Sequence, residues 1–181
     1  LSRDPAFAPA RYERALLTAR RYALRLGELQ DARRRRESAR AMAGAEPRPP
    51  ATNRAMAAED PLARGLAERI AGELAALEQA PADFPRARLA CARALLVLYS
   101  AGEMGDLHAA RAGFEEALAG EPTLEEAYEG LAQLDLALGD PAKAIAAYTR
   151  GLAVDRGYVP HWLGRGSAHM SVGFALGERG G

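Results

Sequence analysis

Few residues of this chain have the types and spacing that catalysis requires. His161 and His169 are eight positions apart, whereas two metal ligands on one helical turn lie three or four apart. Gly164 and Gly166 follow no expected strand, and His169 stands where a dinucleotide-binding fingerprint needs a further glycine. The sequence therefore predicts no enzymatic activity, no cofactor and no metal.

Acidic pairs and the cysteine lead to the same expectation. Glu115-Glu116 and Glu125-Glu126 are adjacent, and adjacent residues of a helix point apart, so we interpret both pairs as solvated faces rather than acid–base pairs. Cys91 is the only cysteine, which excludes an intrachain disulfide and a thiolate metal cluster. A reducing compartment is compatible with this, and a cytoplasmic location is favoured.

Arginines are concentrated near the N-terminus although the formal net charge is zero. Residues 1–56 hold thirteen arginines against six acidic residues, and Arg33 to Arg36 are consecutive. Such a run could contact phosphates. Because no aromatic residue is interleaved to stack on bases, we interpret it as a solvated helix face. We do not expect nucleic acid as a partner, and a nucleic-acid-binding helical repeat is kept as an alternative.

Composition indicates the elements that would position any site. Hydrophobic residues make up 49% of the chain, alanine is the commonest of them, and aromatics are only 6%, which favours close-packed helices over strands. Apolar residues at spacings of three and four predict helices on both sides of Gly27. No apolar run approaches the ~20 residues of a membrane span, so we expect no membrane insertion.

Prolines divide the middle of the chain. Pro47, Pro49 and Pro50 predict a loop or linker over residues 47–60. Asp60-Pro61 then predicts the start of a helix, with the aspartate as its N-cap.

A 34-residue period runs through the C-terminal half. The glycine–aspartate hinges Gly105-Asp106 and Gly139-Asp140 are 34 residues apart, and so are Phe114 and Tyr148. Tyr128 and Trp162 show the same spacing, and we interpret both as packing residues. The period also relates Ala110 to Ala144, Leu118 to Leu152, and the turn residue Pro122 to Arg156. Helix–turn–helix units with this period resemble tetratricopeptide repeats.

The resemblance implies an all-α fold, a right-handed superhelical solenoid of antiparallel helix pairs. It places copies at residues 91–124 and 125–158 and a partial copy at 159–181, within a repeat domain of residues 61–181. Residues 1–46 resemble a degenerate helix pair hinged at Gly27-Glu28. A chain that begins and ends within such repeats is expected to be a piece of a longer protein.

In this family, first-helix residues that face away from the partner helix line a concave groove. The matching positions of this chain are Ala92, Leu95, Tyr99, Glu103, Glu126, Glu129, Gln133, Leu136, Leu163, Ser167 and Met170. Some members bind a chaperone C-terminal carboxylate through lysine, asparagine and arginine. Here Leu95, Tyr99, Glu129 and Gln133 stand at the matching positions, so we do not expect that activity.

The resemblance implies a protein–protein interaction scaffold, whose partner is a protein or peptide ligand or the subunits of a larger assembly. The mixed apolar and acidic groove suits a peptide with leucine-like anchors and a basic residue. The alternative is a regulatory or substrate-recruiting module of a larger enzyme.

Overall fold

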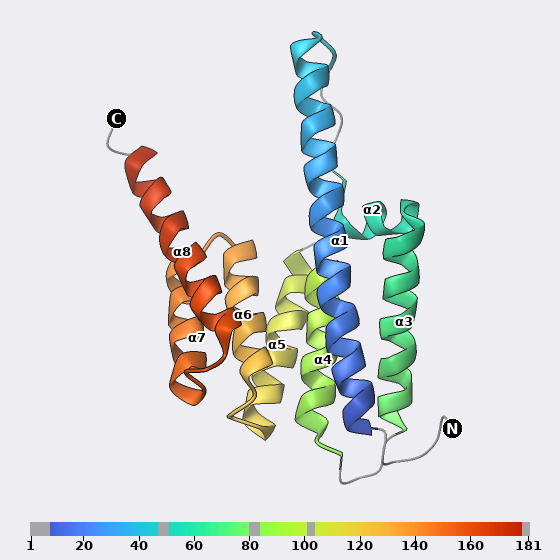
Figure 1. Ribbon diagram of the computed structural model, residues 1–181, viewed down its shortest axis with the longest axis vertical. Coiled ribbons are helices and arrows are strands. Elements are labelled where there is room, and N and C mark those ends of the chain that lie inside the picture. The colour runs from blue at the N-terminus through green and yellow to red at the C-terminus, as the bar shows by residue number, and fades with distance from the viewer. Residues whose placement is uncertain (1–7, 47–50, 80–83, 101–103, 179–181) are drawn as a thin grey trace. The chain divides into compact units, whose positions relative to one another are not determined.

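The computed structural model describes residues 8–46, 51–79, 84–100 and 104–178. These ranges contain eight helices and no strand (Figure 1), which confirms the all-α prediction. The helices form two compact units. One unit contains the first three helices together with Tyr99–Asp106, and the other contains residues 85–98 and the chain from Leu107 onward. The hand of the predicted superhelix stays a prediction.

The first unit is built on α1 (Ala8–Met42) and α3 (Pro61–Glu78), which pack along one another. Tyr12, Tyr22 and Ile70 are among its most deeply buried side chains. The carboxylate of Asp60 caps α3, as predicted, by accepting a hydrogen bond of 2.8 Å from the amide of Ala63.

The same carboxylate ties α1 to the start of α3. Arg25 donates from Nε to Oδ1 of Asp60 at 3.2 Å and from Nη2 to Oδ2 at 2.6 Å. These bonds, followed by the one from the Ala63 amide, lower the pKa of Asp60 to about 2. Arg25 also pairs with Glu28, one turn further along α1.

Two local predictions for this part of the chain are wrong. α1 continues through Gly27, so residues 1–46 do not form a helix pair hinged there. One glycine inside a helix costs only about 1 kcal/mol relative to alanine, and the buried residues Tyr22 and Leu26 hold α1 against α3. The expected loop over 47–60 also contains a short helix, α2 (Asn53–Glu59), whose N-cap Thr52 accepts from the amide of Ala55 at 3.2 Å.

The second unit contains successive helices that run in alternating directions (Figure 1). They are α4 (Arg86–Ser100), α5 (Met104–Gly120), α6 (Glu125–Ala137), α7 (Pro141–Val154) and α8 (Val159–Glu178). The end of α4 and the start of α5, within Tyr99–Asp106, belong to the first unit. α7 packs between α6 and α8, and α6 also touches α8. The limits predicted for the repeat copies stay predictions.

The turn between α6 and α7 follows the residue types expected there. Gly139 has φ +75°, a left-handed conformation that glycine adopts without a steric penalty at a helix C-terminus. Asp140 then caps α7 by accepting from the amide of Lys143 at 3.1 Å, and Pro141 occupies the first turn. The predicted hinge at Gly139-Asp140 is confirmed.

Candidate partner-binding surface

The candidate surface lies on α6 and α8, each the first helix of a helix pair. A contact that recurs after 34 residues holds each of these helices in place. The ring of Phe114 in α5 packs on Gly130 of α6, and the ring of Tyr148 in α7 packs on Gly164 of α8. A β-carbon added to Gly130 would lie 2.3 Å from ring atoms of Phe114, and one added to Gly164 would lie 2.2 Å from Tyr148. An aromatic ring that packs on a glycine therefore fixes α6 against α5, and a second one fixes α8 against α7.

The two aromatics at the start of the first helices bind the preceding turns. The Tyr128 hydroxyl donates to the carbonyl oxygen of Pro122 at 3.1 Å, and the Trp162 indole N–H donates to that of Arg156 at 2.8 Å. The acceptor is a backbone oxygen, so replacing proline by Arg156 leaves this bond in place. Both residues support the turns through these bonds, but neither is in the buried core, because Tyr128 is half-buried and Trp162 is 49% exposed under the guanidinium of Arg165.

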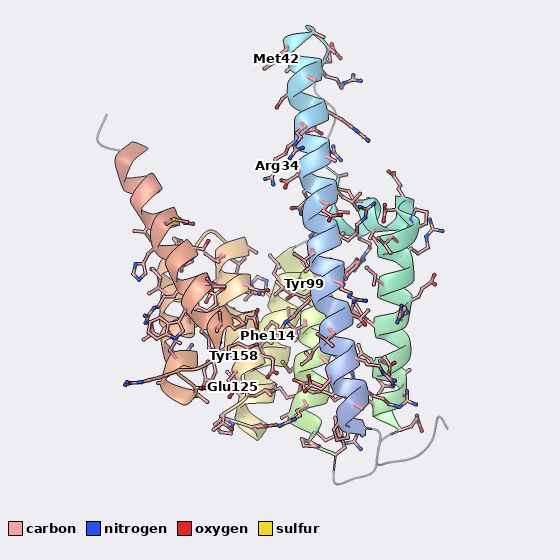
Figure 2. The ribbon with its side chains drawn as sticks, in the orientation of Figure 1. Arg34, Met42, Tyr99, Phe114, Glu125 and Tyr158 are labelled. Atoms are coloured by element: carbon pink, nitrogen blue, oxygen red, sulfur yellow. The ribbon has the colours of Figure 1, made fainter. Side chains whose placement is uncertain are left out.

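The predicted residues of α6 form a row of half-buried side chains: Glu126, Glu129, Gln133 and Leu136. Glu129 joins two of its neighbours. Its Oε1 accepts from Nε2 of Gln133 at 3.0 Å, and its Oε2 accepts from the hydroxyl of Tyr158 at 2.8 Å. Tyr158 lies in the turn before α8 (Figure 2). The structure thus brings these α6 residues together and orients Glu129 from a neighbouring turn.

The other predicted residues differ in their accessibility. Leu163, Ser167 and Met170 are exposed on α8. Tyr99 is half-buried, and its carbonyl oxygen accepts from Nδ2 of Asn53 at 3.3 Å.

The positions in α4 present little side-chain surface. Ala92 and Leu95 are buried, with exposed fractions of 3% and 6%, so in this structure their side chains do not offer a surface to a partner. Glu103 lies outside the described residues. The accessible candidates of the second unit are therefore those of α6 and α8.

Sequence reasoning missed a buried ion pair behind the α6 row. Asp135 is 4% exposed, and its carboxylate accepts a hydrogen bond from Nη2 of Arg111 in α5. The signal in the sequence that could have indicated this pair is an aspartate between two leucines of the expected helix, in Leu134-Asp135-Leu136. A buried carboxylate needs a charged or hydrogen-bonding partner, and Arg111 supplies both.

Burial also shifts the pKa of two groups on the neighbouring helices α7 and α8. It raises the pKa of Tyr148 to about 12, with a smaller contribution from the charge of Glu129. His161 of α8 is fully buried, and its pKa is lowered by burial against the smaller opposing influence of nearby carboxylates.

Neither a metal centre nor a membrane span emerges from the part of the chain that the structure describes. No group of three or more histidine, cysteine, aspartate or glutamate side chains in the described ranges could hold a metal ion. No helix there is both long and apolar enough to cross a membrane.

Comparison with known proteins identifies the repeat. Residues 103–164 match a family model described as tetratricopeptide repeat. No match was found among curated proteins or among solved structures. The matched residues cover the two junctions at which an aromatic ring packs on glycine. The segment from residue 103 to residue 164 is a tetratricopeptide repeat region.

Proposed function

We propose that this chain is a protein-interaction scaffold that binds a peptide on the α6–α8 surface, defined here as Glu126, Glu129, Gln133, Leu136, Leu163, Ser167 and Met170. A tetratricopeptide region is in general a protein-interaction module. The observation that supports the location is the α6 row, in which Glu129 is held by Gln133 and by Tyr158. A carboxylate fixed in this way is pre-organised for a charged ligand.

The charge of α5 and α6 favours a basic partner. Residues 107–140 contain eight acidic residues, and Arg111 is the only lysine or arginine among them. This arginine is already paired with Asp135. Exposed Leu163 and Met170 add apolar contact area on α8. A peptide with lysine or arginine beside leucine-like anchors matches this mixture.

The arginine run of α1 supports nucleic-acid binding less than the α6–α8 surface supports peptide binding. Arg33 pairs with Glu37 at 2.5 Å and Arg34 pairs with Asp31 at 2.5 Å, so two of the four arginines are neutralised within their own helix. Arg34 and the 90% exposed Met42 are labelled on the C-terminal part of α1 in Figure 2. These pairs are what a solvated helix face shows.

Selection from a random peptide library on the 181-residue chain tests the proposal. Enriched peptides should combine lysine or arginine with leucine, and raising the salt concentration should weaken their binding. Selection against the chain carrying E68K serves as the control, because Glu68 is exposed on α3 and is not one of the acidic residues of 107–140. Enrichment of acidic peptides, or of none, would count against the proposal.

A further inference from the structure

His161 is the most unusual buried side chain of the second unit. It is fully buried, and neither Nδ1 nor Nε2 has a hydrogen-bond partner among the described residues. A neutral imidazole always carries one N–H donor. Buried donors are nearly always paired in folded proteins, so this histidine is kept at a cost to stability.

The neighbouring residue types show that its site is specially built. His161 and Gly151 are the 34-residue counterparts of Ala127 and Ala117, which are both fully buried. A β-carbon added to Gly151 would lie 2.2 Å from Nε2 of His161. Glycine at position 151, where the preceding junction has alanine, therefore leaves the space that the imidazole occupies. One junction has two alanines, and the next has glycine and histidine.

Every element packed around His161 contributes a titratable group. Tyr148 of α7 lies 6.0 Å away between ring centroids, and Tyr158 of the preceding turn lies 4.6 Å away. Glu125 and Glu129 of α6 and Asp155 after α7 favour the charged imidazole. Burial opposes them and dominates, so the pKa of His161 is below its ordinary value.

The histidine is also connected to the α6 row. The ring of Tyr158 that packs on His161 carries the hydroxyl that donates to Glu129 at 2.8 Å. A shift of the imidazole toward solvent would move Tyr158, because their rings are in contact. The hydrogen bond that orients Glu129 would then be lost.

We propose that His161 and Gly151 form a proton-sensitive lock between α7 and α8, which is closed around the neutral imidazole and opened by its protonation. Opening frees α8 from α7 and releases Tyr158 from Glu129. The lock is a property of this helix junction, so it operates whether or not the α6–α8 surface binds a peptide.

The direction of the pH effect follows from proton linkage. The opened state has the ordinary histidine pKa of 6.5, and the closed state has a lower one, so the opened state binds the proton more tightly. The closed state keeps its full stability above pH 6.5. Its equilibrium constant falls as the pH drops below 6.5, by at most about tenfold per pH unit, until the pKa of the closed state is reached.

The experiment follows α8 and the imidazole in the native 181-residue chain by NMR. Amide hydrogen exchange of α8, corrected for the intrinsic effect of pH, should accelerate between about pH 7.5 and pH 5.5, while that of α1 should not. The His161 ring signal should titrate below the ordinary histidine pKa of 6.5. Unchanged α8 protection, or a His161 signal that titrates at or above pH 6.5, would overturn the proposal.

A double variant supplies the matched control. G151A/H161A recreates the alanine pair of the preceding junction, so it should fold and its α8 protection should no longer depend on pH in this range. The same pH-dependent loss of α8 protection in this variant would also overturn the proposal. If the variant does not fold, the titration of the native chain still decides the question.

Discussion

Phe114 packs its ring so closely on Gly130 that a β-carbon at position 130 would lie 2.3 Å from two ring carbons. The same relationship recurs between Tyr148 and Gly164. The repeat is therefore a physical contact as well as a sequence period. It sets the distance between each second helix and the next first helix, and so the position of the α6 row.

Replacing Gly130 by alanine should destabilise the second unit. The new methyl group would overlap the Phe114 ring, which is fully buried and has little room to move. Overpacking of this kind costs about 1–3 kcal/mol in free energy of unfolding, measurable by urea denaturation. G166A is the matched control, because Gly166 is also in a helix but has no atom within 4 Å of an added β-carbon. Equal effects of the two substitutions would contradict the packing account.

Replacing Asp135 by alanine should also lower stability, because it leaves the Arg111 guanidinium without its carboxylate. Asp135 has a side-chain exposure of 6% and Arg111 one of 30%, so water compensates only part of the loss. We expect a decrease of about 1–3 kcal/mol in the free energy of unfolding. The K143A variant breaks the exposed Lys143–Asp140 pair and should have no measurable effect. A D135A variant as stable as K143A would disprove the structural role of the buried pair.

Tyr148 should ionise late in an alkaline titration. Its pKa is raised from 10.0 to about 12 by burial, so the unfolded chain releases this proton first. The contribution of Tyr148 to stability is thus intact below pH 10 and is lost as the pH rises from 10 toward 12. Phenolate absorbance should show a late step that Y148F lacks. Identical titration curves for native protein and Y148F would contradict the assignment.

The parts of the fold that depend on local residue types were predictable. The Gly139-Asp140 hinge and the Asp60 cap both follow from short stretches of sequence. The continuity of α1 was not predictable in this way. A single glycine only weakens a helix, and what decides at Gly27 is tertiary packing on α3 together with the Arg25–Asp60 bonds.

The candidate surface was predictable only in part. Family positions locate the α6 row, but they do not encode how deeply Ala92 and Leu95 are buried. Nor do they show that Gly151 and His161 replace the two alanines of the preceding junction as a pair, because each residue type is ordinary when its position is considered by itself. Only the packing of the two residues shows that one makes space for the other.

A reciprocal charge exchange between protein and peptide tests the central claim most directly. The dissociation constant of a selected basic peptide should rise at least about tenfold, or 1.4 kcal/mol, for the E126K variant. Changing the basic residues of the peptide to glutamate should restore binding to E126K, while E68K, which alters an exposed glutamate of α3, should bind the original peptide normally. An E126K variant that binds the original peptide as tightly as the native chain would contradict the proposal that the α6 row recognises the partner.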